Sequence, residues 1–413
     1  MQFQRLSLTP LNHKEFRLFL FTRVFYTMAL RMVVTVIGYE LFQITHDSFS
    51  IGLAGLSEFI PVFSLALYAG HVIDRSDKRS LYLKSIISYA LCIAALIVLT
   101  TPAIQHQLTA KTAALLFYVV IFFSGIIRAF AGPTSNAIIA QLVPRDSLRF
   151  AASLSSTSYL TASILGHASA GFLIAGIGVN KTFYVIFFLV AMAALVVSRI
   201  GRKPVVHNNL TAKAWESVKE GLSFVFKSKI LLGAISLDLF AVLFGGATAL
   251  IPEFADRILQ VGPVGFGWLN AAMDIGSAIS IVSITFFPLL RRQGYKLLFA
   301  VAFFGICIIT FGFSKIYLLS FGALLLAGMV DGVSVVVRST VLQLTTPDEM
   351  RGRVSAVNSM FINSSNELGQ FESGFTYRLL GGAVPAVVFG GCMTLVVAVI
   401  TWFKAPTLRK FEY

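Results

Sequence analysis

The sequence predicts an all-α membrane protein whose twelve transmembrane helices form two pseudo-symmetric six-helix bundles. Three observations support this fold class: an apolar composition, apolar runs of membrane-spanning length, and a nonapeptide that recurs in the second half. Of the 413 residues, 56% are hydrophobic and 13% are charged, and the mean hydropathy is +0.81. A soluble protein would not expose so much apolar surface, so the composition indicates a polytopic membrane protein.

Apolar runs of about 20 residues, each long enough for one helical crossing, recur along the whole chain. We place the predicted spans near residues 17–42, 51–72, 81–103, 112–131, 150–176, 182–201, 229–252, 264–289, 295–314, 316–340, 353–377 and 383–404. The first run is too long for the core of a signal peptide, so we expect it to remain as a helix.

The basic residues predict the orientation of the chain. A formal charge of +14 could indicate a nucleic-acid-binding protein, but the Lys and Arg residues lie in short clusters at the ends of apolar runs, as membrane topology uses them. If the N-terminus is cytoplasmic, the external loops contain few basic residues: Lys111, Lys181, Arg257, Lys315 and Arg378. We therefore expect a multi-pass protein of the cytoplasmic (inner) membrane, with both termini in the cytoplasm and no nucleic-acid partner.

An internal repeat predicts two equivalent halves. The peptide 141–149, QLVPRDSLR, follows the fourth span, and a related peptide, QLTTPDEMR at 343–351, follows the tenth. A duplicated arrangement of six plus six helices is typical of transporters. We expect an N-terminal bundle at residues 1–202, a cytoplasmic linker at 203–228 and a C-terminal bundle at 229–413.

The linker contains apolar residues at helical spacing: Trp215, Val218, Leu222 and Val225. Lysine and glutamate residues occupy the opposite face. This pattern predicts an amphipathic helix that lies at the membrane surface and joins the two halves. A solvated linker helix without lipid contact is the alternative.

Ionisable residues within the apolar runs indicate which helices face the bundle interior, because a charge in hydrocarbon costs about 3 kcal/mol or more. The third, sixth, ninth and twelfth spans contain none in their middles. From the other spans we select candidates for a proton or substrate site: Arg23, Arg31, Glu58, His167, Asp238, Asp274, Asp331 and Glu367.

Proton coupling requires an embedded carboxylate or imidazole whose protonation is linked to a conformational change. Asp238, Asp331 and Glu367 are the leading candidates in the second half, and Glu58 and His167 are candidates in the first. The alternative is that each acid forms a static ion pair with one of the embedded arginines, Arg23, Arg31 or Arg338.

Neutral polar and aromatic side chains on the interior spans predict the lining of a substrate cavity: Tyr26, Tyr159, Asn270, Asn363 and Asn366. Such a lining suits an amphipathic organic molecule better than a bare ion. Three arginines of the first half, Arg23, Arg31 and Arg128, would suit an anionic substrate. We expect no metal site and no cofactor, because the six histidines are dispersed and the three cysteines have no metal-binding spacing.

Several motifs resemble those of the major facilitator superfamily. The polar loop between the second and third spans, Gly70-xxx-Asp74-Arg75-xx-Lys78-Arg79, resembles its signature. Arg128-xxx-Gly132 resembles its motif on the fourth helix, and residues 166–171 resemble the motif linked to antiporters. Residues 237–247 and 350–356 look like the branch that contains enterobactin-exporter-type and other small-molecule efflux permeases. Two residues depart from the pattern: Asp77 stands where glycine is usual, and His167 stands where proline is usual.

The polar loop is a predicted gate. Gly70 would permit a close helix crossing, and Asp74 would face the N-terminus of the eleventh span, where unpaired N–H groups favour a carboxylate. The resemblance implies the same gating role, with Arg75 and Arg128 as partners of the acid. The alternative is that these residues only set the topology.

These observations predict a monomeric secondary transporter in the lipid bilayer, which exports a small siderophore- or drug-like molecule in exchange for protons by alternating access. An importer of a metabolite or of an iron–siderophore complex, with the same fold, is the alternative. An integral membrane enzyme is a remote alternative, because no catalytic constellation is present in the sequence.

Overall fold

The structure, a computed structural model, describes residues 8–204, 214–287, 289 and 291–412. The chain forms two compact units, of which the first contains residues 1–37 and 60–211 and the second contains residues 38–59 and 212–413. The tip of the first helical hairpin, residues 38–59, therefore belongs to the second unit, although the chain on both sides of it belongs to the first.

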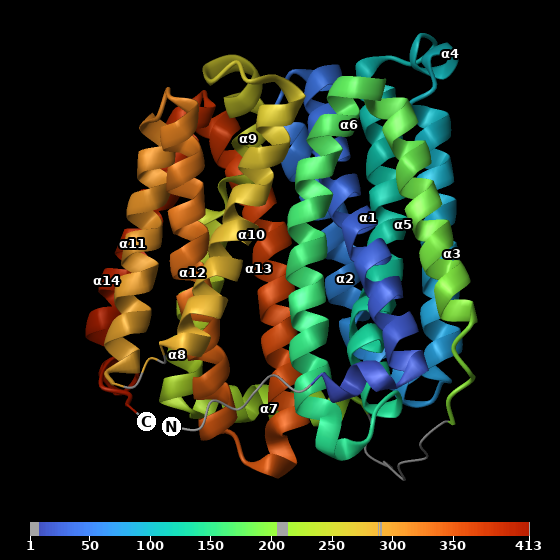
Figure 1. Cartoon of the computed structure of the whole chain (residues 1–413). Helices are drawn as coiled ribbons and strands as arrows, with labels where there is room; N and C mark the ends of the chain where they lie inside the picture. Colours follow the sequence, from blue (N-terminus) through green and yellow to red (C-terminus); the bar gives the residue numbers. More distant parts are fainter. Residues whose placement is uncertain (1–7, 205–213, 288, 290, 413) are drawn as a thin grey trace. The chain divides into compact units, whose positions relative to one another are not determined.

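The first half of the chain forms long helices joined by short turns (Figure 1). Its elements are η1 (Thr9–Asn12), α1 (Lys14–Thr45), α2 (Phe49–Asp74), α3 (Lys78–Leu99), α4 (Pro102–Gln105), α5 (Ala110–Ile138), η2 (Ile139–Gln141), η3 (Arg145–Ser147) and α6 (Leu148–Ser198). Within the first unit, α3 packs against both α5 and α6.

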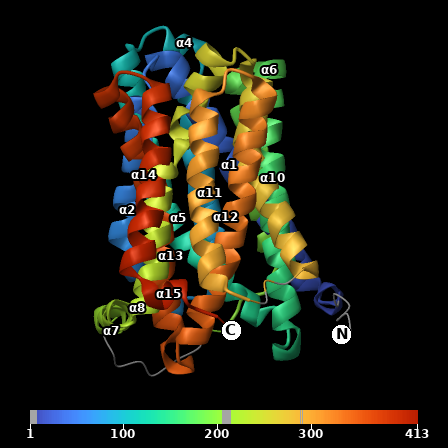
Figure 2. The ribbon, with the colours of Figure 1, turned by 90° about the vertical axis from the view of Figure 1, so that its left-hand side faces the viewer.

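The second half begins with the linker helix and continues with a second set of long helices (Figure 2). Its elements are α7 (Ala214–Lys227), α8 (Lys229–Gly245), η4 (Ala247–Leu250), α9 (Ile251–Glu253), the π-helical turn η5 (Phe254–Ile258), α10 (Gly262–Phe286), α11 (Gln293–Phe313), α12 (Tyr317–Thr345), η6 (Asp348–Met350), α13 (Arg351–Leu380), α14 (Ala383–Lys404) and α15 (Pro406–Arg409). Here α10 packs beside α12, and α11 packs beside both α12 and α14.

The predicted spans correspond in position to these helices. Ten helical segments of the described chain are long and apolar enough to cross a membrane. The fifth and sixth predicted spans correspond to two helices within α6 (Leu148–Ser198), which meet at a kink at Gly178, where φ is +81°. The eleventh predicted span corresponds to α13, which is not among the ten; its crossing of the membrane stays a prediction.

The repeated nonapeptide has the same local structure in both halves. In the first copy, η3 follows Pro144 and leads into α6; in the second, η6 follows Pro347 and leads into α13. In each case proline ends the preceding segment and a single 3₁₀ turn redirects the chain into a long helix.

The linker helix α7 packs against α8 and α13. Val225 is buried in the apolar core that these helices share, with Leu222 beside it. An ion pair joins Glu220 to Arg353. The side of α7 that carries Val225 therefore contacts protein rather than lipid. The side chains of Trp215 and Val218 lie outside the described residues.

Candidate functional site

The polar loop between α2 and α3 is built around Asp77. This residue is the N-cap of α3, and its carboxylate accepts hydrogen bonds from the backbone N–H of Arg79 (3.1 Å) and from the hydroxyl of Ser80 (2.6 Å). It also accepts a hydrogen bond from the backbone N–H of Lys203 (3.0 Å), beyond the end of α6. The sequence departure at Asp77 thus has a structural role: the carboxylate caps one helix and joins it to another segment.

A second set of contacts holds the same loop on the end of α6. The guanidinium of Arg79 donates to the carbonyl oxygens of Ile200 (2.9 Å) and Ser198, which lie at the C-terminal end of α6. A cation there stabilises the last carbonyl groups of a helix. Glu15 at the start of α1 accepts from the backbone N–H of Gly201 (2.9 Å). These side-chain contacts of Arg79 therefore lie within the first unit.

We expect Asp77→Ala to lower the stability of the first unit by about 1–2 kcal/mol, because an N-cap and a further hydrogen bond are lost. Partial burial raises the pKa of Asp77, but the hydrogen bonds from Ser80 and from the backbone of Lys203 and Arg79 outweigh burial and lower this pKa below its usual value. A lowered pKa in the folded state adds stability above the unfolded pKa, which is lost as the pH falls through the folded value.

Thermal unfolding in detergent checks this prediction. The difference in Tm between wild type and Asp77→Asn should be present at pH 7 and should shrink as the pH falls below about 4. Asp146→Asn, at an exposed acid of another turn, is the control and should leave Tm unchanged. A Tm difference that stays constant from pH 7 to acid would contradict the role assigned to the carboxylate.

The structure does not test the gating role of the other residues of the predicted gate. Asp74 and Arg75 are exposed at the end of α2, and Lys78 is buried at the start of α3. A Cβ added at Gly70 would meet nothing within 4 Å among the described residues, so the structure shows no contact there that requires glycine. The start of α13, the expected partner of Asp74, belongs to the other unit. The latch therefore stays a prediction.

Two arginines of α1 meet one tyrosine of α6 within the first unit. The guanidinium carbons of Arg23 and Arg31 lie 5.6 and 5.5 Å from the centroid of the Tyr159 ring. Arg31 also donates to the Tyr159 hydroxyl (2.5 Å). Cations at this distance from an aromatic ring are attracted by its electron-rich face. Arg23, Arg31 and Tyr159, predicted separately, are thus brought together.

Arg23 also lines a cavity of about 340 Å³ in the first unit. The lining residues are Arg23, Asn136, Ile139, Ala140, Leu148, Ala152, Ser155 and Ser156. The Arg23 guanidinium donates to the hydroxyl of Ser135 (3.0 Å) and to the side-chain oxygen of Asn136 (3.3 Å). The run from Ser153 to Ser163, which contains Ser155, is a predicted part of the lining, whereas no pattern in the sequence indicates Asn136, because neutral polar residues on a helix usually serve packing.

His167 joins α6 to α1 instead of lining this cavity. Its Nδ1 atom lies 2.6 Å from the hydroxyl of Thr35, and the imidazole is buried. Beside it, a Cβ on Gly166 would lie 2.7 Å from both the Arg31 Cβ and the Met28 carbonyl oxygen. Glycine in the antiporter-like motif therefore permits the two helices to approach closely.

Tyr26 and Arg128 lie away from the cavity lining. Tyr26 is buried, and its ring packs edge-on against Tyr82 (6.0 Å) and Tyr89 (5.6 Å) of α3. Tyr26 therefore packs helices together in this structure, whereas the sequence placed it at the cavity. Arg128 is partly buried in α5.

The second unit contains an acidic cluster around one arginine. Asp238 of α8 forms an ion pair with Arg338 of α12, and their side chains are only 8% and 11% exposed. The Arg338 Nε atom also donates to the hydroxyl of Ser334 (3.2 Å). Asp331 lies within electrostatic range of Asp238, Arg338 and Asp274. This state of Asp238 corresponds to the ion-pair alternative drawn from the sequence.

Close packing of α10 and α12 fixes the geometry of this cluster. A Cβ at Gly328 would collide with the backbone of Met273, and the Ser277 hydroxyl donates to the Gly328 carbonyl oxygen (2.9 Å). These contacts place Asp274 and Asp331 on packed turns of two helices.

The remaining candidates are spread over the second unit. Glu367 is buried in α13, and Glu58 is partly buried in α2. Asn270 donates to the Phe266 carbonyl oxygen, and Asn366 donates to the Ile362 carbonyl oxygen. The Asn363 side chain lies outside the described residues.

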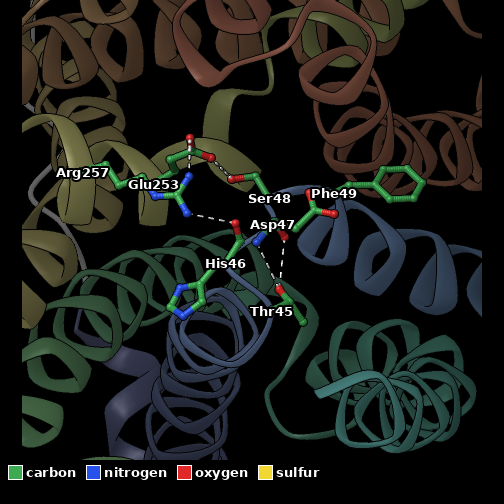
Figure 3. Close-up of polar contacts among 7 residues, drawn as sticks. All are labelled: Thr45, His46, Asp47, Ser48, Phe49, Glu253 and Arg257. Carbon is green, nitrogen blue, oxygen red and sulfur yellow. Dashed lines mark hydrogen bonds and ion pairs between the residues drawn. The ribbon is translucent and has the colours of Figure 1, made fainter. Parts of the chain in front are cut away.

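A polar network that sequence reasoning missed holds the hairpin tip within the second unit (Figure 3). Ser48, fully buried, donates to the carboxylate of Glu253 (2.6 Å). Arg257 donates to the His46 carbonyl oxygen (3.1 Å) and pairs with Glu253 (3.5 Å). Its guanidinium also lies over the ring of Phe42, 5.2 Å from the centroid.

A second arginine contacts the other side of the hairpin tip. Arg378, at the end of α13, lies 3.8 Å from the Asp47 carboxylate and 4.7 Å from the centroid of the Phe49 ring. Asp47 in turn accepts from the backbone N–H of Phe49 (2.9 Å), which caps α2. Arg257 and Arg378 are both among the few basic residues in the predicted external loops. That scarcity was the one signal in the sequence that pointed to them.

Glycine residues bring α2 and α13 into close contact just below the hairpin tip. A Cβ at Gly52 would lie 3.1 Å from the Gln370 carbonyl oxygen and 3.2 Å from the Gly374 Cα. A Cβ at Gly55 would lie 2.9 Å from the Gln370 Cβ. The two helices therefore touch backbone to backbone, which only small residues permit.

A family model described as Major Facilitator Superfamily matches residues 19–370. The chain belongs to the major facilitator superfamily. It is 25% identical to an uncharacterized MFS-type transporter, YfiS, of Bacillus subtilis (strain 168), over 92% of this chain and 90% of that protein. It is 22% identical to the enterobactin exporter EntS of Shigella boydii serotype 18, over 97% of this chain and 94% of that protein.

The fold is also that of solved transporters. A crystal structure of a mutant of the nucleoside transporter NupG is similar to this structure with a TM-score of 0.71, at 13% identity, over 95% of this chain and 98% of that one. As a major facilitator superfamily member the protein is a multi-pass membrane transporter of small molecules, not an enzyme. The predicted family and the predicted all-α membrane fold are confirmed, whereas the count of twelve transmembrane helices stays a prediction.

Proposed function

We propose that this protein exports a small organic molecule across the cytoplasmic membrane in exchange for protons, as a monomer with both termini in the cytoplasm. The observation that carries this proposal is the acidic cluster of the second unit, in which buried Asp238 pairs with Arg338 and the partly buried Asp331 and Asp274 lie within electrostatic range. The likeness to EntS, named as an enterobactin exporter, supports export of a siderophore-like compound. The residues of the cluster would carry the coupling ion.

The charges of the cluster favour proton exchange. Asp238 and Asp331 are two carboxylates within electrostatic range of the single positive charge of Arg338, and the Asp238–Arg338 pair is largely removed from water. Excess negative charge in a low-dielectric interior is relieved by taking up a proton. Protonation of Asp238 would weaken its ion pair with Arg338 and so the contact between α8 and α12, and a change in helix contact is what alternating access requires.

The hairpin tip supplies one gate of the proposed cycle. Residues 38–59 are covalently part of the first half but pack within the second unit. To open at the predicted external side, the protein would have to break the Ser48–Glu253 and Asp47–Arg378 contacts. We propose that these contacts keep that side closed while substrate binds from the cytoplasm, and that the predicted latch residues Gly70, Asp74, Arg75, Lys78, Arg79 and Arg128 act at the opposite side.

Purified protein in liposomes with an imposed pH gradient tests the function. Radiolabelled enterobactin, other siderophores and cationic dyes serve as probes. Movement of a probe against the proton flow supports the proposal. Accumulation driven by protons moving with the probe would replace export by the importer alternative, and absence of any gradient-driven movement across the screen would contradict proton coupling.

We expect Asp74→Asn to reduce transport by about tenfold or more, because it removes the carboxylate that the N-terminus of α13 would stabilise. The amount of protein in the membrane should stay normal, since Asp74 is exposed and packs against little of the first unit. Asp146→Asn is the matched control at another exposed turn. Normal transport by Asp74→Asn at normal membrane levels would show that the loop only sets topology.

A further inference from the structure

The first unit contains few acidic residues, and arginines lie within its spans. Acids of residues 1–37 and 60–211 are few, and each lies at the end of a helix or in a turn: Glu15, Asp74, Asp77 and Asp146. The spans themselves contain Arg23, Arg31 and Arg128. A guanidinium within hydrocarbon depth is costly unless an anion or polar groups compensate it.

Arg23 is the residue in this interior whose contacts leave room for an anion. Its hydrogen bonds go to the neutral side chains of Ser135 and Asn136, and its third contact is the face of the Tyr159 ring. The Arg23 Nε atom is buried and has no hydrogen-bond partner among the described residues. No carboxylate of the described chain accepts a hydrogen bond from Arg23. A buried donor in this condition costs free energy until an acceptor reaches it.

The cavity beside Arg23 is also lined by a second residue whose buried polar atom has no hydrogen-bond partner among the described residues. Ser155 is 2% exposed, lines the cavity, and its hydroxyl has no hydrogen-bond partner among the described residues. Asn136 and Ser156 add further polar groups, whereas Ile139 and Leu148 supply an apolar wall. A volume of about 340 Å³ suits a small organic molecule. Donors at one side and an apolar wall at the other match an amphipathic anion.

We infer that this cavity binds the carboxylate of an amphipathic organic anion, with Arg23 and the Ser155 hydroxyl as donors and with Ile139 and Leu148 against the apolar body. The inference rests on the proposed transport function and names the chemical class of its substrate. Guanidinium and hydroxyl donors on one carboxylate form charge-assisted hydrogen bonds, which are the strong ones in a protein interior. The second unit, with its embedded acids, is electrostatically unsuited to such a ligand.

The test is equilibrium binding to the purified full-length protein in detergent at pH 7, measured by calorimetry and by the rise in Tm. The probes are 1-naphthoate and its neutral analogue 1-naphthamide, which share one apolar body and differ in charge. We expect naphthoate to bind and to raise Tm, and naphthamide to bind at least about tenfold more weakly. Equal binding of the two probes would overturn the inference.

Variants locate the site. Arg23→Gln should weaken naphthoate binding by about ten- to a hundredfold, and Ser155→Ala by several-fold. Lys181→Gln, which removes an exposed cation at the other end of the first unit, should leave binding unchanged. If Arg23→Gln fails to fold, Ser155→Leu, which fills the cavity, should still abolish binding. Unchanged binding in Ser155→Leu, or in folded Arg23→Gln, would overturn the assignment.

Two further measurements distinguish the anion site from a lipid-headgroup site and from the proposed transport function. Inorganic phosphate that competes more strongly than naphthoate would indicate a lipid-headgroup site and overturn the inference. Because binding is measured without a membrane gradient, it does not depend on proton coupling. A protein that binds naphthoate through Arg23 but moves no probe in liposomes would refute the proposed transport function alone, whereas gradient-driven transport without naphthoate binding would refute the anion site alone.

Discussion

Replacement of Asp238 by asparagine is expected to abolish proton-driven accumulation of the substrate while exchange of labelled for unlabelled substrate continues. The side chain is almost fully buried in an ion pair with Arg338. Asparagine keeps the shape and some hydrogen bonding but cannot take up or release a proton at physiological pH. Coupled transport should therefore fall to background, by tenfold or more, in liposomes with an imposed pH gradient.

Stability must be separated from coupling in this experiment. Removing one partner of a buried ion pair typically costs about 3–5 kcal/mol, because the other charge is left uncompensated. Asp331 lies within electrostatic range of Arg338 and should reduce this cost. The double variant Asp238→Asn with Arg338→Gln replaces the pair by two neutral amides, so it should fold and remain uncoupled. Glu412→Gln, at an exposed acid near the C-terminus, is the matched control.

The outcome that would contradict the role of Asp238 is full proton-driven accumulation by the double variant. The pair would then be a static contact between α8 and α12, as the ion-pair alternative holds. Asp331→Asn in the same assay would then show whether the second carboxylate of the cluster carries the proton. Loss of both coupled transport and exchange, with normal unfolding temperature, would assign the pair to substrate binding instead.

The fold could be predicted because hydrophobic length and sequence repetition are local properties. Spans need about 20 apolar residues, and the repeat at 141–149 and 343–351 showed that one plan is used twice. The structure adds what local patterns do not contain. The break between the two helices of α6 lies at one residue, Gly178, and the packing of α7 depends on a buried contact of Val225 with helices of the second unit.

The candidate site was only partly predictable, for a physical reason. Burial of a charge in an apolar run signals that it faces protein or water, but not which partner it meets. Arg23, Arg31 and Tyr159 were found individually and the structure joined them. Asp77 was recognised as a departure, yet its partner beyond α6 is far away in the sequence. Tyr26 shows the opposite case, because an aromatic on an interior span can pack against tyrosines as readily as against a ligand.

The hairpin tip was missed because its polar residues lie at the ends of spans, where charges are ordinary. Asp47, Ser48 and Glu253 have no unusual spacing in the sequence. Their meaning comes from residues 38–59 packing within the second unit, which hydropathy cannot show. The two units differ in the charged residues of their spans. Arg23, Arg31 and Arg128 belong to the first unit, whereas Asp238, Asp274 and Asp331 belong to the second.

If the hairpin tip acts as the proposed gate, Gly52→Leu is expected to open the predicted external side. A Cβ at Gly52 already lies at 3.1–3.2 Å from backbone atoms of α13, so leucine cannot fit unless α2 and α13 separate. Overpacking costs on the order of 3 kcal/mol, which would shift the equilibrium away from the closed form by about a hundredfold. Separation would also pull Ser48 from Glu253 and Asp47 from Arg378.

Labelling of Ile51→Cys with a membrane-impermeant maleimide measures this opening, in a Cys392→Ala background because Cys392 is exposed. Ile51 is buried, so Ile51→Cys alone should react slowly, and addition of Gly52→Leu should raise the rate at least about tenfold. Gly176→Leu is the matched control, since a Cβ at Gly176 meets nothing within 4 Å, and it should leave the rate unchanged. Unchanged labelling with Gly52→Leu in a folded protein would mean that α2 and α13 can accommodate the side chain without parting. The hairpin tip would then be a fixed part of the second unit, and the external gate would have to lie elsewhere.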